Sequence, residues 1–173
     1  YGRGQIALGH VMYDLAEQAL KENDPRSAFD YFNTARQYYL NALELDGQPV
    51  AALVKEKANH SLGNVYQVLY QIVDPRLHQQ YFDDSIASYQ AVLDSLATIR
   101  LEWLQPSIVS LAADTQWRMG SMYQLAGRYP EAITAYEQAI NLSNDPIFDE
   151  FVQGDLTKLA LTATPAVEGT ANP

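Results

Sequence analysis

The feature of this sequence that most constrains its fold is the spacing of small and aromatic residues within residues 113–146, ADTQWRMGSMYQLAGRYPEAITAYEQAINLSNDP. Five of these residues stand at fixed separations from one another: Gly120, Tyr123, Ala132, Tyr136 and Ala139. Between the first two and the last three lies Gly127, a residue type that suits a turn. No other stretch of the chain has a spacing that can be matched so fully to a known repeat.

The segment resembles a tetratricopeptide repeat, a unit of about 34 residues that forms a helix, a turn and a second helix. In that family, small residues at position 8 and aromatic residues at position 11 let the first helix meet the second closely, and alanines at positions 20 and 27 bracket an aromatic residue at position 24. The five residues above occupy these positions, with Gly127 and Tyr129 at the turn. The family's tryptophan at position 4 is replaced by Gln116, and Trp117 stands one position later. Moving the register by one residue would recover the tryptophan and lose the other five matches.

The amino-terminal part of the chain carries a weaker copy of the same pattern. Residues 1–4 contain two glycines and no periodicity, so we expect a flexible lead-in before a helix from Gln5 to about Glu22. Asn23-Asp24-Pro25 then supplies a capping side chain and a proline, which predict the start of a second helix. In that helix three residues match positions 20, 24 and 27 of the repeat: Ala28, Phe32 and Ala35. Residues 46–49, Asp-Gly-Gln-Pro, predict its end and a new start.

The middle of the chain contains a third copy. A helix predicted from about residue 49 to Val73 includes the family signature L-G-x-x-Y at Leu62, Gly63 and Tyr66. Asp74-Pro75 repeats the capping signal before a fourth helix, whose apolar residues continue as far as Trp103. Positions 20, 24 and 27 are filled there by Ser85, Tyr89 and Val92.

The distances between these matched positions predict helices longer than those of the standard repeat. Gly63 follows Ala28 by 35 residues and Gly120 follows Ser85 by 35 residues, where the repeat has about 22. We interpret the surplus at each junction as about two additional turns on each of the adjoining helices. A further surplus between Gly63 and Ser85 predicts a fourth helix that is lengthened at its start, around residues 77–81.

The sequence therefore predicts an all-α fold, a helical-hairpin solenoid of three tetratricopeptide-like repeats with lengthened helices. Pro106 opens the first helix of the third repeat, and Asn144-Asp145-Pro146 starts a last helix to about Leu161 that resembles a capping helix. With 173 residues, of which 47% are apolar, we expect one domain over residues 1–161. Residues 162–173, TATPAVEGTANP, are expected to form an extended tail.

The charge and composition exclude several classes of function. The net charge is −10, and the basic residues are scattered singly, which disfavours binding to nucleic acid or to an anionic membrane surface. No run approaches the roughly 18 apolar residues of a membrane span, so we expect no membrane insertion by this segment. The chain has no cysteine, which removes disulfides and thiolate metal sites. It begins at Tyr1, which indicates either a removed leader or an excised segment and leaves the compartment open.

The sequence offers little for catalysis. The three histidines are not spaced with carboxylates as metal ligands are, and there is no phosphate-binding glycine loop or nucleophile elbow. Paired carboxylates such as Asp83 and Asp84 stand at predicted helix starts, where they offset the helix dipole. We therefore predict a protein that is not an enzyme and needs no cofactor or metal.

The resemblance to the tetratricopeptide family implies a binding groove on the concave face of the solenoid. In the family, positions 2, 5, 9 and 12 of each first helix line a groove that holds an extended peptide or a partner helix. Carried onto this chain, the resemblance implies a groove of His10, Tyr13, Glu17 and Leu20 from the first helix, then Lys57, His60, Asn64 and Gln67, and finally Asp114, Trp117, Ser121 and Gln124. Rigid aromatic residues are common hot spots, so Trp117 is the leading candidate for binding, with core packing as the alternative.

Two functions remain open at this stage. The resemblance implies a non-catalytic scaffold or adaptor whose protein or peptide partner the sequence does not identify. The alternative is a structural subunit, because hairpins with large exposed end faces could associate end to end into an oligomer or filament. A third hypothesis, an enzyme with an unrecognised active site, has no motif in its favour.

Overall fold

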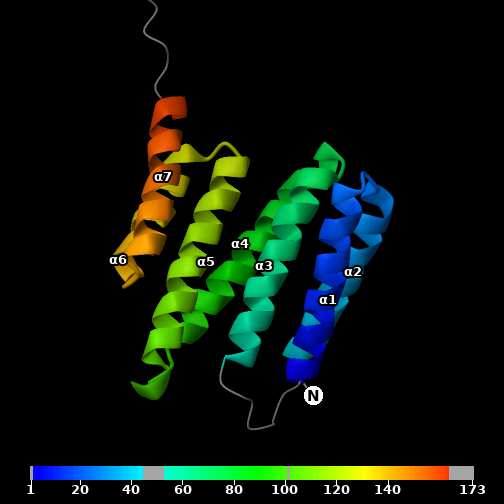
Figure 1. Cartoon of the computed structure of the whole chain (residues 1–173), viewed down its shortest axis with the longest axis horizontal. Coiled ribbons are helices and arrows are strands. Elements are labelled where there is room, and N and C mark those ends of the chain that lie inside the picture. Colours follow the sequence, from blue (N-terminus) through cyan, green and yellow to red (C-terminus); the bar gives the residue numbers. More distant parts are fainter. Residues whose placement is uncertain (1, 45–52, 101, 164–173) are drawn as a thin grey trace, which may run out of the picture.

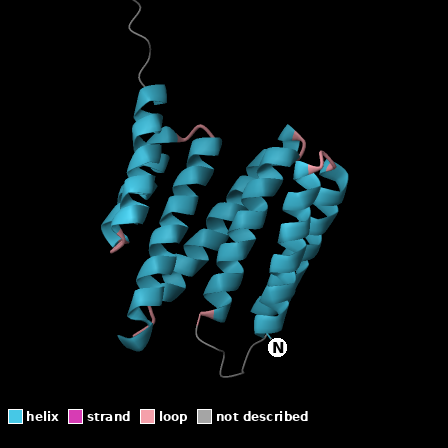
Figure 2. Cartoon of the chain, in the orientation of Figure 1, coloured by secondary structure: helices cyan, strands magenta, loops and turns pink. Residues whose placement is uncertain are grey.

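A computed structural model describes residues 2–44, 53–100 and 102–163 of the chain, and within them the secondary structure is helical (Figure 2). The described residues form seven α-helices: α1 (Gly2–Lys21), α2 (Pro25–Leu43), α3 (Val54–Ile72), α4 (His78–Leu96), α5 (Gln105–Leu125), α6 (Tyr129–Leu142) and α7 (Pro146–Ala163). Two short 3₁₀ helices precede α4 and α5, at Pro75–Leu77 and Glu102–Leu104. The prediction of an all-α fold is confirmed.

Local sequence signals start and stop several of these helices as predicted. The carboxylate of Asp24 accepts a hydrogen bond from the backbone N–H of Ser27 at 3.1 Å, and Pro25 is the first residue of α2. Asp74 caps the 3₁₀ turn before α4 in the same way, by accepting from the backbone N–H of Arg76 at 3.0 Å. Gly127, between α5 and α6, has a φ of 72°, a left-handed conformation that glycine adopts without strain.

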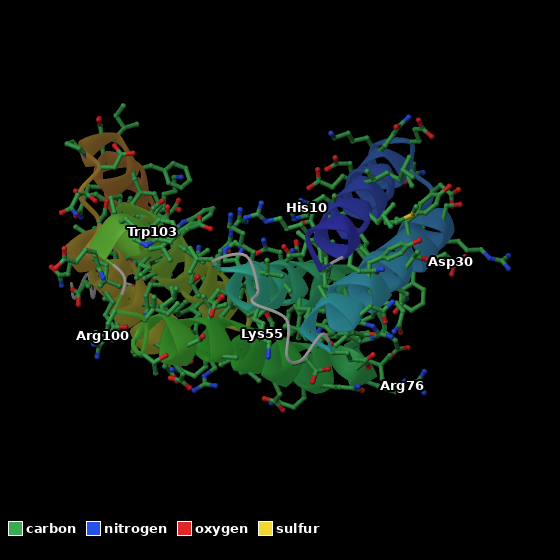
Figure 3. All side chains as sticks on the ribbon, turned by 90° about the horizontal axis from the view of Figure 1, so that it is seen from below. His10, Asp30, Lys55, Arg76, Arg100 and Trp103 are labelled. Carbon is green, nitrogen blue, oxygen red and sulfur yellow. The ribbon has the colours of Figure 1, made fainter. Side chains whose placement is uncertain are left out.

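The helices pair into antiparallel hairpins that stack side by side. α1 packs against α2, α3 against α4 and α5 against α6, and each second helix also contacts the first helix of the next hairpin. α7 packs against α6 and covers the last hairpin, so that the helices follow chain order from one end of the molecule to the other (Figure 1). Viewed along the helices, the stack is a crescent with α1 and α7 on its two arms and α3 and α5 on its inner side (Figure 3). We call this inner side the concave face.

Each hairpin is closed by the same contact between a glycine and a tyrosine. The glycine lies on the first helix and the tyrosine ring on the second, in the pairs Gly9–Tyr39, Gly63–Tyr89 and Gly120–Tyr136. A Cβ atom added to the glycine would stand only 2.4, 2.3 or 2.6 Å from a ring carbon of the respective tyrosine. All three tyrosines are at most 1% exposed, so the absence of a side chain on the glycine is what lets the two helices approach.

The glycine contacts correct the predicted register of the first hairpin. Ala28, Phe32 and Ala35 are buried as expected, but the tyrosine that meets Gly9 lies one heptad later in α2. The residues equivalent to positions 20, 24 and 27 are therefore Ala35, Tyr39 and Ala42. Both triplets have the same four-three spacing, so they share one face of α2 and form two successive layers of the same core.

Several predicted boundaries also differ from the structure. α1 already begins at Gly2, so residues 2–4 are helical where a flexible lead-in was expected. α4 ends at Leu96, and Trp103 belongs to the 3₁₀ turn before α5 rather than to the fourth helix. α7 continues to Ala163, two residues into the predicted tail. The predicted connection at residues 46–49, the predicted helix start near residue 49 and the remainder of the tail lie outside the described residues.

The residues in excess of the standard repeat length lie in other places than predicted. In the first hairpin they lengthen α1 after Gly9 and α2 before Ala35, which makes this hairpin taller at its loop. At the second junction α4 continues past Ser85 for almost the same length as α6 continues past Ala132, so α4 is not extended there. That surplus lies at the start of α5 and in the connection of residues 97–104. The predicted lengthening of α4 at its start is also only partial, because Pro75–Leu77 form a 3₁₀ turn.

Candidate functional site

The predicted groove residues lie on α1, α3 and α5, the helices that line the concave face (Figure 3). Aligning the chain on Gly9, Gly63 and Gly120 places ten of the twelve predicted groove residues in four rows of equivalent positions. The rows are Lys57 with Asp114, His60 with Trp117, His10 with Asn64 and Ser121, and Tyr13 with Gln67 and Gln124. The positions predicted for α1 were wrong by one heptad, because with Gly9 at position 8 His10 and Tyr13 stand at positions 9 and 12 instead of 2 and 5. Glu17 and Leu20 lie farther along α1, in the layer added by its extra turns.

Many of these side chains contact the next first helix instead of standing free. Nε2 of His60 on α3 lies 2.6 Å from Oδ2 of Asp114 on α5. The side-chain amide of Gln67 donates to the hydroxyl of Ser121 at 2.8 Å. On the other side of α3, Ser61 Oγ lies 3.3 Å from Nε2 of His10 on α1. The concave face is therefore a polar seam that ties α1 to α3 and α3 to α5.

The tyrosines of the second and third hairpin contacts hold side chains of the concave face in place through hydrogen bonds. The hydroxyl of Tyr89 donates to the side-chain oxygens of Asn64 and Gln67, at 2.7 and 3.1 Å. The hydroxyl of Tyr136 donates to Oε1 of Gln124 at 2.8 Å. Because Gln67 accepts from Tyr89 and donates to Ser121, the orientation of its amide is fixed by both helices it bridges.

The contact between His60 and Asp114 changes the electrostatics of the seam. Burial raises the pKa of the Asp114 carboxyl, but the contact with His60 and the charge of Arg118 outweigh burial and hold the pKa below its usual value. Asp114 is therefore a stable carboxylate at neutral pH. The guanidinium of Arg118 is itself half-buried beside it and lies 4.4 Å from the ring centroid of Trp117.

Trp117 faces α7, which was not considered as part of the groove. Its indole Nε1 donates to Oδ2 of Asp155 at 3.1 Å, and its ring meets the ring of Phe151 edge to face at 5.3 Å. Both partners belong to α7, and the indole remains half-exposed between them. Trp117 also packs against the buried cluster of α6 and α7, as the alternative interpretation expected. Its role as a binding hot spot stays a prediction.

Two clefts lie on either side of this contact. The larger, of about 750 Å³, is lined by Lys57 of α3, by the first half of α5 including Ser110 and Asp114, and by Phe148 of α7. The smaller, of about 480 Å³, is lined by Ser121 and Gln124 of α5 together with Tyr136 and Asp155. Four of the predicted groove residues therefore border open space: Lys57, Asp114, Ser121 and Gln124.

The prediction missed the contribution of α7. Gly154 follows Gly120 by one repeat length of 34 residues, which makes Phe151 equivalent to Trp117 and Asp155 equivalent to Ser121. That spacing would have identified Phe151 and Asp155 as members of the concave face if the last helix had been treated as a first helix of the repeat. A third cleft, of about 320 Å³, opens on the outer side between α4, α5 and α6 and includes Gln116, the residue at the family's tryptophan position.

The described residues contain no cluster of three or more histidine or acidic side chains placed to hold a metal ion. None of the helices described here has the length and apolar character of a membrane span.

Comparison with protein families gives one match. A family description of the tetratricopeptide repeat matches residues 118–146, from the middle of α5 to the start of α7. This is a single repeat, and it coincides with the segment whose spacing is most regular. A search of curated proteins found no match to the chain.

Proposed function

The chain is a tetratricopeptide-like helical-repeat protein, matched to that family over one repeat, and we propose that it is a scaffold that binds an extended segment of a partner protein on its concave face. Such repeats serve in general as protein-interaction modules. More specifically, we place the binding site along the boundary between α5 and α7, where the two clefts open.

The observation that carries the proposal is the arrangement of open and occupied positions along α5. Asp114 borders the larger cleft, Trp117 the bridge to α7, and Ser121 the smaller cleft, so the three positions follow one another along one helix face. An extended peptide bound across this helix face would contact polar side chains that the interhelix contacts hold in place. Because those contacts fix the side chains before binding, little conformational entropy is lost on binding.

The larger cleft has the chemistry to select a peptide. Lys57 is exposed at its edge, and Ser110 and Asp114 add hydrogen-bonding groups beside the apolar ring of Phe148. A partner segment that places an apolar side chain on Phe148 and an acidic side chain near Lys57 would satisfy both. Mixed apolar and polar lining of this kind is typical of binding clefts.

The test uses peptides selected from a random phage-displayed library against the whole chain. Affinities are then measured for Lys57→Glu, which reverses the charge of the one basic side chain among the described residues that line this cleft, and for Lys21→Glu, a matched change at the exposed end of α1. Ser110→Arg fills the cleft, and Ala87→Arg on the exposed side of α4 is its control. We expect the two cleft variants to weaken binding about tenfold or more, equivalent to about 1.4 kcal/mol, and the two controls to leave it unchanged.

A fluorescence measurement adds a second readout. In a Trp103→Phe background Trp117 is the sole tryptophan, because the chain has two. Binding at the clefts should then change its emission, whereas Trp103 itself is 72% exposed on the turn before α5. Selection of no peptide, or of peptides that bind all four variants equally and leave Trp117 emission unchanged, would refute the proposed site.

A further inference from the structure

The first helix carries an apolar stripe on the side that faces away from the rest of the stack. Leu8, Val11 and Leu15 follow each other at three- and four-residue steps and are 44%, 52% and 37% exposed. We call these three residues the α1 stripe. They are separate from the concave face, which takes His10 and Tyr13 from the same helix.

The equivalent residues of the later hairpins lie in the core. Alignment on the hairpin glycines makes the α1 stripe equivalent to Leu62, Val65 and Leu69 of α3, which are at most 2% exposed. The first two are equivalent in α5 to Met119 and Met122, which are 6% and 0% exposed. The three α3 residues belong to one buried cluster with residues of α2, and Met119 of α5 clusters with Tyr89 of α4, so this side meets the second helix of the preceding hairpin. The α1 stripe thus has the composition of an interior helix face, and no described helix covers it.

The helix at the opposite end of the stack, α7, also has apolar residues that no described helix covers. Ile147, Phe151 and Leu161 of α7 are 80%, 52% and 76% exposed, and we call them the α7 stripe. Gly154 lies among them in the helix, and a Cβ atom added to it would meet nothing within 4 Å, whereas each hairpin glycine is covered by a tyrosine of its own second helix. The Gly154 side of α7 is therefore the one that a second helix covers in the three hairpins, and Phe151 lies at its edge, where its ring also meets Trp117 of the concave face.

We propose that the α1 stripe of one copy of this chain docks on the α7 stripe of another, in a head-to-tail contact. Among the described residues, no helix lies on the preceding side of α1 or on the following side of α7, so each of the two helices supplies the neighbour that the other has not. The contact removes apolar surface of both helices from water, and a side chain of α1 occupies the open space beside Gly154. The helices α1 and α7 lie toward opposite ends of the stack (Figure 1), so a contact between their stripes is heterologous and leaves one stripe of each copy free.

Charge makes the association dependent on salt. Each copy carries a net charge of −10, so two copies repel one another at low ionic strength. Screening of this repulsion at raised salt strengthens the contact, while the apolar stripes themselves are little affected. A contact held together mainly by ion pairs would instead become weaker as the salt concentration is raised.

The experiment measures mass by light scattering behind size exclusion over a hundredfold range of protein concentration, at low and at raised salt. We expect the mass to grow beyond the 19.4 kDa of one chain as concentration and salt increase. Val11→Asp blocks the α1 stripe and Ile147→Asp the α7 stripe. Both residues are exposed, so the variants should keep the helicity of the unmodified chain. Each variant alone should remain a monomer, and Ala87→Asp on the outer side of α4 should associate like the unmodified chain.

Mixing the two blocked variants tests the direction of the contact. The Val11→Asp chain keeps its α7 stripe and the Ile147→Asp chain keeps its α1 stripe, so the mixture should form a one-to-one dimer and nothing larger. Association of Ile147→Asp on its own would show that two α1 stripes pair symmetrically, and would overturn the head-to-tail contact. A constant monomer mass for the unmodified chain at all concentrations would overturn self-association altogether, leaving a helix of another protein as the occupant. Because Phe151 of the α7 stripe contacts Trp117, peptide binding at the clefts is measured separately, on the Val11→Asp chain, which should remain a monomer.

Discussion

Gly63→Ala tests the contact on which each hairpin depends. The new methyl group would stand 2.3 Å from Cε1 of Tyr89, well inside the distance at which carbon atoms touch. Tyr89 is fully buried, and its hydroxyl bonds to Asn64 and Gln67 resist a movement of the ring. The substitution must therefore either displace the ring or separate α3 from α4.

The expected cost follows from three contributions. Overpacking in a close-packed core costs up to about 3 kcal/mol, and losing the Tyr89 hydroxyl bond costs about 1 kcal/mol more. Alanine within a helix is better than glycine by about 1 kcal/mol, which offsets part of this. The net loss of unfolding free energy is then about 3 kcal/mol. For a chain of this size, such a loss lowers the midpoint of thermal unfolding by roughly 6–12 °C.

The assay is urea unfolding followed by circular dichroism at 222 nm, with dilute protein. Gly154→Ala is the matched control, because it makes the same change inside a helix where nothing lies within 4 Å, and it should stabilise the chain by about 0.5–1 kcal/mol. In a Tyr89→Leu background, Gly63→Ala should lose most of its cost, since the ring it collides with is gone. If Gly63→Ala stabilises the unmodified chain as Gly154→Ala does, the glycine–tyrosine contact does not set the hairpin spacing.

Two further predictions concern the interior and the seam. Leu69→Ala should lower the unfolding free energy by about 2–5 kcal/mol and Leu15→Ala, at the equivalent position of α1, by about 0.5 kcal/mol or less, because Leu69 is fully buried and Leu15 is 37% exposed. Equal losses in urea unfolding would show that Leu15 is covered as Leu69 is, and would contradict an exposed α1 stripe. The depressed pKa of Asp114 contributes stability that is fully present above the unfolded-state value of about 3.9 and is lost as the pH falls through the lower folded-state value. His60→Gln should therefore raise the pKa of Asp114, measured from its side-chain carboxyl shift by NMR, and an unchanged titration would exclude His60 as the cause.

The sequence by itself determined the helices, most of their ends and the pairing of helices into hairpins. These are local properties: capping residues such as Asp24 act within one turn, and the four-three spacing of small and aromatic residues within each second helix is readable along the chain. The register of the first hairpin was not determined in this way, because Ala28–Phe32–Ala35 and Ala35–Tyr39–Ala42 have identical spacing. A helical pattern repeats after seven residues, so only the contact between Gly9 and Tyr39 distinguishes the two layers.

For the candidate site, the period of a helix determined which residues share one side of each first helix, but Phe151 and Asp155 of α7 were not predicted on the concave face. It did not determine which of them remain open to a partner. His60 meets Asp114 and Trp117 meets Asp155 because neighbouring first helices stand at a particular distance and rotation, and these are set by the packing of the second helices behind them. The tertiary structure alone decided that part, because the atoms brought together are 38 or more residues apart in the chain and no local spacing encodes their contact.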